Sequence, residues 1–474
     1  MTASTHRPHR YLRSAVLLSL ALGMSFSCSR FEDPVLPEKD AAFKKYFGGN
    51  RQQEGLTVEP ITTGYVVLGN TNSYEVEDTT DFVRQPQALL LYTDAFGDEA
   101  NSVLVGEADA SVSAVQMLLE NEAGDLVFVG NKTKNDSTTI VMYAVSNQGT
   151  TIEKTFEFGP NTVVDYGLTG VPIRDIEAND LIMTDEGLAI LATVNPGTNT
   201  SQVAVLKEDF SDPAKPYIMY LFGFADGETA NAFTTIRLSD GSTAFSILAT
   251  TREQFGTVVR KKMSVLLLSF EGQNLADIVI DDDMFSYFDL LPANENNQTL
   301  TRQNLTNNQQ TGFDILPTVR GADITCTTCP QDVLIFGSES FRNTSIVIRL
   351  SINNARTAAV QWGYWLNYGG QNISPVKITE LQGGSFLLLS NTITGVAENN
   401  PNSDFLLDRI TRDGNSVSAI WPRFYGGTGD DFAGDIKEVS NVNGGYVIVG
   451  NVTLAGDNTL INLIKTNPLG EIAN

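Results

Sequence analysis

A single pattern recurs seven times along the chain, at intervals close to sixty residues. Each copy contains a turn residue, a run of β-forming apolar residues, a small residue and a polar loop. The small residues that close the seven runs are Gly69, Gly130, Ala192, Ala249, Gly337, Ser390 and Gly450. Their spacings are 61, 62, 57, 88, 53 and 60 residues. Because unrelated strands rarely fall at a shared interval, the chain is predicted to be an array of structural repeats.

All copies but the last also carry the runs expected of a four-stranded unit. A second apolar run follows the small residue, as in ALLLYT from Ala88. A turn and a third run come next, and the third run often ends in an aromatic residue and glycine, as in FEFG from Phe156. A fourth, polar strand then leads to the next copy. Such units predict an all-β fold: a single β-propeller over residues 43–474, with seven four-stranded blades.

The two ends of this region predict how the ring closes. The chain carries FKKYFGG near residue 43 and RFYGG near residue 423, but it ends after the second strand of its last unit. Aligning the glycine pairs matches Phe43 with Trp421, Tyr46 with Phe424, and Phe47 with Tyr425. Residues 44–49 are therefore expected to supply the missing strand, so that the N-terminal strand completes the last blade and removes an exposed sheet edge.

The first 27 residues have the pattern of an export signal. Arg7, Arg10 and Arg13 precede a short apolar run that is too short to span a bilayer. The segment SFSC, which ends at Cys28, resembles a bacterial lipobox, although Ser25 stands where leucine is usual. We expect residues 1–27 to be a lipoprotein signal peptide, Cys28 to be lipidated, and residues 28–42 to form a tether to the outer membrane. The alternative is ordinary cleavage at another position.

Charge and histidine content narrow the possible functions. The formal net charge is −25, which argues against a nucleic-acid partner. The only histidines are His6 and His9, and both lie in the expected signal peptide. A chain without them has no histidine for a catalytic triad or for a histidine–metal site.

The longest interval between repeats, from Ala249 to Gly337, holds about thirty extra residues. We expect a region inserted in the propeller at residues 281–330, rich in Asn and Gln, to form surface loops. Cys326 and Cys329 lie in this region, in the sequence CTTCP. For an exported protein we expect them to form a small disulfide; unpaired thiols or a functional pair are the alternatives.

Aromatic and acidic clusters are the candidates for ligand contact. Most aromatic residues of the third runs are expected to pack between blades, whereas Trp365 and Tyr368 are the candidates for a sugar-binding platform. The glycine-pair alignment matches Trp365 with Pro422 rather than with an aromatic residue, so Trp365 is expected to be exposed. Asp430 and Asp431, near Asp435, and a second acidic run at residues 281–283 offer oxygen ligands for Ca²⁺. The alternative is that these acids are solvated loop residues. No catalytic residue, metal ligand or other cofactor is assigned.

The motifs GGYVIVGN, LIKTNPLGEI and RFYGGTGDD, which lie within about the last sixty residues, resemble repeat β-propellers of secreted and surface proteins in Bacteroidetes. The resemblance implies a propeller fold and a cell-surface setting. It implies no catalytic residues.

These observations lead to two functional hypotheses. The first is a non-catalytic binding or scaffold protein that contacts a glycan or an envelope protein through polar loops, which begin at Asn72, Thr250 and Ile393. The alternative is a carbohydrate-active enzyme, a glycosidase or lyase, that uses carboxylates without histidine. Two inward carboxylates with raised pKa values in one apolar-walled pocket would favour the enzyme.

Overall fold

The computed structural model describes residues 42–472 with internal gaps. The gaps are residues 49–51, 73–85, 108, 160–172, 199, 209–216, 224–226, 256–257, 281–308, 321–324, 341–343, 354–355, 367, 369–371, 395–401, 418–420, 427–428, 440–443 and 455–457. Within the described residues all regular structure is β-strand, and no helix could cross a membrane.

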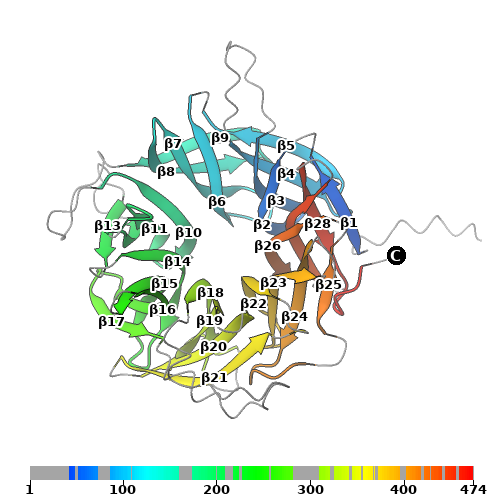
Figure 1. The fold of residues 1–474 in the computed structure, drawn as a ribbon. Helices are drawn as coiled ribbons and strands as arrows, with labels where there is room; N and C mark the ends of the chain where they lie inside the picture. The colour runs from blue at the N-terminus through cyan, green and yellow to red at the C-terminus, as the bar shows by residue number, and fades with distance from the viewer. Residues whose placement is uncertain are drawn as a thin grey trace, which may run out of the picture. The chain divides into compact units, whose positions relative to one another are not determined.

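The strands form seven antiparallel four-stranded sheets arranged around an axis, as Figure 1 shows. Blade 1 contains β2 (Gln53–Ile61), β3 (Gly64–Thr71), β4 (Gln87–Asp94) and β5 (Glu99–Val105). Blade 2 contains β6 (Ser111–Leu119), β7 (Leu126–Lys134), β8 (Ser137–Ser146) and β9 (Thr151–Phe158). Blade 3 contains β10 (Ile176–Thr184), β11 (Gly187–Val194), β12 (Gln202–Glu208) and β13 (Tyr217–Phe222). Blade 4 contains β14 (Glu228–Arg237), β15 (Thr243–Phe255), β16 (Val258–Ser269) and β17 (Asn274–Val279).

Blade 5 contains β18 (Gln310–Val319), β19 (Gln331–Glu339), β20 (Thr344–Ile352) and β21 (Ala358–Leu366). Blade 6 contains β22 (Ile373–Glu380), β23 (Phe386–Thr394), β24 (Asn402–Ile410) and β25 (Arg423–Tyr425). Blade 7 contains β26 (Asp431–Glu438), β27 (Tyr446–Thr453), β28 (Thr459–Lys465) and, from the other end of the chain, β1 (Phe43–Phe47). The predicted seven-bladed propeller is confirmed. The polar strand before each apolar run is the innermost strand of the same blade as that run (Figure 1).

The predicted ring closure is also confirmed. Strand β1 pairs antiparallel with β28, from Phe43 opposite Lys465 to Phe47 opposite Ile461. Phe47 thereby takes the same place in blade 7 that Tyr425 takes in blade 6, opposite Phe405. The chain closes the ring by joining its two ends in one sheet.

The glycine-pair alignment is wrong in blade 5. Trp365 lies opposite Ile346, which is the position that Phe424 takes opposite Leu406. The alignment had matched Trp365 with Pro422 instead. The reason is that the glycine pair follows β25 directly but begins three residues beyond the end of β21, so it does not mark the strand register.

Seven apolar clusters of described residues hold the blades together, and each one joins two neighbouring blades. The cluster between blades 4 and 5, for example, includes Leu248, Met263 and Ile348, all almost fully buried. Another of the seven clusters joins blade 7 to blade 1 and contacts Phe43 and Phe47 of β1. The two-sided burial explains why the middle strands read as continuous apolar runs.

Every innermost strand has a β-bulge at the same place in the repeat. The residue before the bulge is small in most blades and lies opposite the small residue that closes the apolar run, as Gly55 lies opposite Gly69. The bulged residues are Leu56, Val115, Asn179, Asn231, Phe313, Val376 and Gly434. A Cβ atom added at Gly450 would lie 2.2 Å from the carbonyl oxygen of Phe432. The backbones of neighbouring strands therefore approach closely at the small residues.

At five junctions the side chain of the residue after the small residue bonds to the next blade. In blade 2 the side-chain oxygen of Asn131 accepts the N–H of Ala178 at 2.7 Å, and its amide donates to the carbonyl of Ala178 at 3.1 Å. Four other junctions use the same position; the acceptors there are Asn70, Thr193, Thr250 and Asn391. At the junction of blades 5 and 6 the facing residue is Pro375, which has no N–H to satisfy.

Two predicted loop regions are shorter than expected. Within residues 281–330, β18 is the innermost strand of blade 5 and the described part after it forms the connection to β19. The stretch that begins at Thr250 is mostly a hairpin extension of β15 and β16, with Arg252 opposite Lys261. The sequence does not reveal these strands because their residues are polar. Polar side chains are compatible with strand pairing that extends beyond the apolar core.

Candidate functional site

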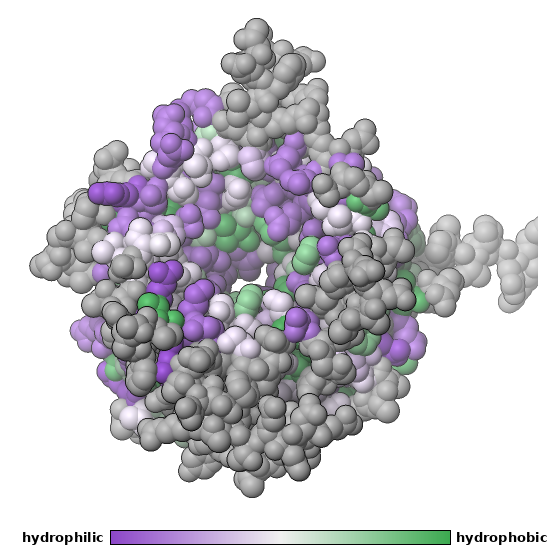
Figure 2. All heavy atoms as spheres, viewed as in Figure 1, coloured by the Kyte–Doolittle hydropathy of each residue, from purple (hydrophilic) through white to green (hydrophobic). Residues whose placement is uncertain are grey.

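The seven innermost strands surround a central channel, and the bulges face it. A cavity of about 320 Å³ lies in this channel and is lined from all seven blades by residues at or beside the bulges. Figure 2 shows the opening at the centre of the ring, with both hydrophilic and hydrophobic residues around it. A bulge places an extra side chain where regular alternation would not, and bulges are frequent near functional sites.

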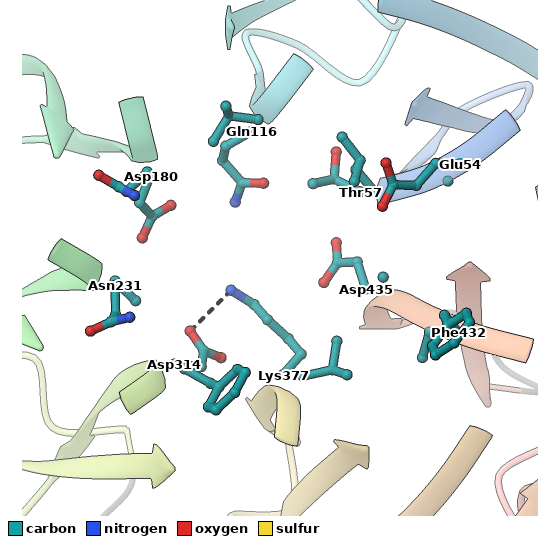
Figure 3. Close-up of a pocket in the computed structure, with 18 of the residues that line it drawn as sticks. Glu54, Thr57, Gln116, Asp180, Asn231, Asp314, Lys377, Phe432 and Asp435 are labelled. Atoms are coloured by element: carbon teal, nitrogen blue, oxygen red, sulfur yellow. Dashed lines mark hydrogen bonds and ion pairs between the residues drawn. The ribbon is translucent and has the colours of Figure 1, made fainter. Parts of the chain in front are cut away.

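The residues directly after the bulges form a ring inside the channel (Figure 3). The seven members of this post-bulge ring are Thr57, Gln116, Asp180, Ala232, Asp314, Lys377 and Asp435. Three members are aspartates and one is a lysine, so this ring carries negative and positive charges close together.

The three aspartates make the same contacts with their neighbouring blades. Asp180 accepts the N–H of Phe233 at 3.2 Å, and Asp435 accepts the N–H of Val58 at 3.2 Å. The second oxygen of each accepts the N–H of the residue that follows it, at 2.8 Å. Each carboxylate thus holds two blades together at the edge of the channel.

Asp314 adds the channel's lysine to this arrangement. Its Oδ2 accepts the N–H of Ile378 at 2.8 Å, and its Oδ1 lies 3.2 Å from Nζ of Lys377. Asp314 is almost fully buried, whereas the Lys377 side chain keeps 28% of its exposure. The ion pair therefore lies at the cavity wall, with the ammonium group turned toward Asp314 (Figure 3).

Burial shifts the ionisation of these groups. Loss of solvent raises the pKa of Asp180 to about 6, and the field of Asp314 adds to this effect while Lys377 opposes it. Burial also raises the pKa of Asp314. Burial alone favours the neutral amine of Lys377, but the carboxylates of Asp314, Asp180 and Asp435 outweigh it and raise its pKa above the usual value.

A second ion pair lies at the junction of blades 7 and 1. Nζ of Lys437 lies 2.7 Å from Oε1 of Glu59 and 3.9 Å from Oδ2 of Asp435. Burial raises the pKa of Glu59 even though Lys437 stabilises its charged form. This pair joins the ends of the ring electrostatically at the same junction that β1 closes.

A larger cavity of about 630 Å³ opens beside the channel, between blades 5, 6 and 7. It lies where innermost strands begin and second strands end, and it is called the mouth cavity below. Its lining is mostly hydroxyl and amide side chains, including Thr311, Ser374 and Asn391, with the carboxylates of Glu339 and Asp430. Phe432 lines both the mouth cavity and the channel cavity.

The residues proposed from the sequence are distributed over several places. Cys326 and Cys329 are joined by a disulfide with Cα atoms 5.5 Å apart, in the connection between β18 and β19. Asp430 lines the mouth cavity, where its Oδ1 accepts the N–H of Ser403 at 2.9 Å. Asp431 is fully buried. Cys28 and the acidic run at 281–283 lie outside the described residues.

The acidic residues near Asp430 do not converge on one point. Asp430 lines the mouth cavity, Asp431 is buried and Asp435 lines the channel cavity. Across the residues that the structure describes, no three His, Cys, Asp or Glu side chains are grouped closely enough to hold a metal ion. The Ca²⁺ hypothesis therefore gains no site from this acidic run.

The aromatic candidates serve mainly as structural contacts. Trp365 is half-buried and packs against the apolar cluster between blades 4 and 5. The hydroxyl of Tyr368 donates to Oδ2 of Asp408, which also accepts the hydroxyl of Tyr364 at 3.1 Å. Phe424, which was expected to pack between blades, is 47% exposed because it points away from the junction that Tyr425 fills.

The channel residues were missed in the sequence, although a signal for them exists. A small residue, any residue, aspartate and then Leu or Ile occur in three copies, at Asp180, Asp314 and Asp435. The same pattern also occurs at Asp125 and Asp323, so it identifies the bulge only together with its position in the repeat. Lys377 has no such signal, since it replaces aspartate at the equivalent position.

Comparison with known proteins adds no family. No family model matches the chain, and no curated protein matches it. A structure from Dyadobacter fermentans, described as a protein of unknown function, is 11% identical, with a TM-score of 0.40, and covers 76% of this chain and 95% of its own. An α-L-arabinanase of Penicillium chrysogenum, complexed with arabinobiose, is 12% identical, with a TM-score of 0.39, and covers 90% of this chain and 100% of its own. An α-L-arabinofuranosidase of Fusarium graminearum is 11% identical, with a TM-score of 0.40, and covers 78% and 97%. At these values the similarities support no statement about activity.

Proposed function

We propose that this protein is a lipid-anchored extracytoplasmic propeller that acts as a binding or scaffold module for a glycan or an envelope protein. Lipidation of Cys28 would hold it at the outer membrane, as in the surface propellers of Bacteroidetes that its last repeats resemble. The observation that favours binding over catalysis is that the channel carboxylates are already bonded to other groups of the protein. Their oxygens accept backbone N–H groups of two blades or pair with Lys377.

The commitment of these oxygens weighs against acid–base chemistry. A general base needs a lone pair directed at the substrate proton, and a nucleophilic carboxylate needs an accessible oxygen. In Asp180 and Asp435, one carboxylate oxygen accepts an N–H of the next blade and the other accepts an N–H of the same strand. These aspartates act as structural connections of the ring, and the open mouth cavity beside them provides the surface for binding.

The enzyme alternative keeps one observation in its favour. Asp180 and Asp314 are two channel carboxyl groups whose pKa values are both raised, and the cavity wall includes the apolar side chains of Val115 and Phe313. Paired carboxyl groups in different protonation states are what glycoside hydrolysis requires. This alternative predicts that one of the two carboxyls is indispensable for turnover.

One experiment separates binding from catalysis. The purified protein is incubated with a panel of polysaccharides, and new reducing ends or unsaturated products are measured alongside a crosslinking pulldown from envelope fractions. Retention of a polysaccharide or capture of one envelope protein, without new chain ends, supports the proposal. Turnover that disappears in Asp180→Asn or in Asp314→Asn, while the variant remains folded, would overturn it.

A second experiment tests the anchor. The full chain is expressed in a bacterial host and its membrane and soluble fractions are compared. We expect Cys28→Ala to move the protein out of the membrane fraction. The matched control is the double variant Cys326→Ala with Cys329→Ala, which removes the two disulfide-bonded cysteines and should stay membrane-bound. Equal membrane retention of the Cys28 variant and the native chain contradicts lipidation at this residue.

A further inference from the structure

Two neighbouring bulges of the channel carry asparagine, whereas the other five carry apolar residues or glycine. Asn179 lies at the bulge of blade 3 and Asn231 at the bulge of blade 4. The bulged residues of the other blades are Leu56, Val115, Phe313, Val376 and Gly434. Asparagine is therefore not required to form the bulge, and both asparagine side chains line the channel cavity.

A threonine fixes the direction in which each of these two amides points. Oγ1 of Thr250 accepts the N–H of Gly312 at 3.3 Å and donates its own proton to Oδ1 of Asn231, 2.8 Å away. Thr193 makes the equivalent bond to Asn179 in blade 3, also at 2.8 Å. Because the oxygen of each amide faces a threonine, its NH₂ group faces the other way. Figure 3 shows the nitrogen of Asn231 on the channel side.

Two further donors face the same cavity. Nζ of Lys377 carries three N–H groups and, within the described residues, bonds through one of them to Oδ1 of Asp314. Figure 3 shows the amide of Gln116 extending from blade 2 toward this ammonium group. Together with the amide of Asn231, donors from blades 2, 4 and 6 thus line one cavity, which is the arrangement that holds a carboxylate.

Blades 7 and 1 provide acceptors at the same level of the channel. Asp435 is 2% exposed and Thr57 is 7% exposed. Each oxygen of Asp435 accepts one backbone N–H and has a second lone pair for another donor. Oγ1 of Thr57 is buried and has no hydrogen-bond partner in the part of the chain that the structure describes. A buried hydroxyl without a partner is costly, so this position favours a bound polar group.

The charge of the post-bulge ring indicates which polar groups fit. All seven members of this ring are described, and they include three aspartates and one lysine. An ammonium group beside Asp435 would offset the negative excess of the ring. A carboxylate beside Lys377 would meet the ring's cation and the amide donors around it. A ligand with both groups therefore matches the ring better than a ligand with either group alone.

We infer that the channel cavity binds an amino acid in its zwitterionic form. Its ammonium group is held by Asp435 and Thr57, and its carboxylate by Lys377, Gln116 and Asn231. The cavity volume of about 320 Å³ lies at the lower end of the usual range of small-ligand sites, which suits a ligand of this size. The channel aspartates keep their bonds to the neighbouring blades in this arrangement. The inference goes beyond the proposed binding of a glycan or an envelope protein and does not rest on it.

The test uses isothermal titration calorimetry on the full chain at neutral pH. The probes are the standard L-amino acids. Each one that binds is compared with two matched analogues: the carboxylic acid that lacks the amine, and the amine that lacks the carboxylate. We expect at least one amino acid to bind. Both of its analogues should bind at least about tenfold more weakly, because each loses charge-assisted hydrogen bonds.

Three substitutions test the assigned groups. Asn231→Asp keeps the oxygen that accepts the Thr250 hydroxyl but replaces the NH₂ group with a negative oxygen, so it should weaken binding by at least about tenfold. Gln116→Leu removes one donor and should weaken binding by about tenfold. Thr57→Val removes a hydroxyl that has no partner among the described residues, so it should weaken binding and leave the midpoint of urea unfolding unchanged.

The matched controls place the same changes outside the channel. Asn353→Asp adds the same charge at the turn after β20, where Oδ1 of Asn353 accepts the N–H of Thr357. Gln361→Leu repeats the other substitution on β21, the outermost strand of blade 5, where Gln361 is exposed. Both controls should leave affinity within about twofold, because they touch no group of the channel and distant charges are screened by salt.

Several results would overturn the inference. One is an amine or a carboxylic acid that binds as tightly as its parent amino acid, because the site would then not recognise both charged groups. Another is unchanged affinity in folded Asn231→Asp and Gln116→Leu variants, because the ligand would then lie elsewhere. Failure of every amino acid to bind has the same consequence. The polysaccharide and pulldown experiments are independent of these outcomes, so either proposal can fail without the other.

Discussion

Truncation of Phe43 should open the ring at the junction of its two ends. Phe43 begins β1, packs against the apolar cluster between blades 7 and 1, and meets the ring of Tyr65 edge-on with centroids 5.9 Å apart. Its ring also covers Gly97, where an added Cβ would lie 2.4 Å from it. Complete burial of a phenylalanine makes truncation to alanine cost about 3–5 kcal/mol. Because Phe43 is half-buried, we expect Phe43→Ala to cost about 2 kcal/mol.

The same strand supplies the control. Tyr46 is 50% exposed on the opposite face of β1, and its ring lies 5.3 Å from Nζ of Lys44. An exposed cation–π contact contributes about 0.5 kcal/mol, so Tyr46→Ala should cost no more than that. The ion pair between Lys45 and Asp98, 2.6 Å long, is exposed and remains in both variants.

The assay is hydrogen exchange of the β28 amides that pair with β1. When β1 detaches, these amides become the edge of a sheet, so their protection reports the opening of the ring. A cost of about 2 kcal/mol raises the population of the open ring by about 30-fold, since about 1.4 kcal/mol corresponds to a factor of ten. Tyr46→Ala should change protection by about twofold. Equal loss of protection in both variants, or loss spread evenly over all seven blades, would refute the view that β1 is a local closure.

Three further predictions concern the repeat itself. Asn131→Ala leaves a buried N–H of the next blade unpaired and should cost about 1–3 kcal/mol in urea unfolding, whereas Ser338→Ala, at the equivalent position facing a proline, should cost under about 0.5 kcal/mol. Gly450→Ala brings a Cβ within 2.5 Å of two neighbouring atoms and should lower the unfolding temperature, because overpacking costs about 1–3 kcal/mol; Gly383→Ala has no heavy atom within 4 Å of its new Cβ and should be neutral. The pKa of Asp180 in the folded protein is about 6, whereas its value in the unfolded chain is about 3.9. Ionised Asp180 therefore lowers the folding stability above about pH 6, and this destabilisation disappears as the pH falls toward about 4. Asp180→Asn should therefore gain more stability over the native chain at about pH 7.5 than at about pH 4.5, and a gain independent of pH would contradict the raised pKa.

The blade number and the ring closure were predictable because they depend on features that the sequence displays directly. A period near sixty residues sets the number of units, and a last unit that lacks one strand requires a strand from elsewhere. The match of Phe47 with Tyr425 succeeded because a glycine follows each residue at the end of its strand. The match of Trp365 failed because the glycine pair of that repeat lies beyond the strand, where it does not fix the register.

The channel was not predicted because it depends on the bulges, which the sequence marks in only three of the seven repeats. A bulge moves every later side chain of a strand to the other face, and periodic patterns of polar and apolar residues do not show where this happens. Asp180 and Asp314 therefore looked like two of many acids in an acidic chain. Only the pairing of strands shows that they share one ring with Lys377.

The contrast between recurring and exceptional residues separates structure from function in this propeller. Asp180 and its equivalents recur, and their bonds to the next blade explain why a carboxylate stands there. Phe432 does not recur, since the other six copies carry polar residues at its position. Trp365 shows the opposite outcome, because in the correct register it aligns with Phe424 and Tyr46, two other aromatic residues of outermost strands. Trp365 packs between blades 4 and 5 and belongs to the architecture of the ring. Phe432 lines both cavities and is therefore the aromatic residue to substitute first in a search for the ligand.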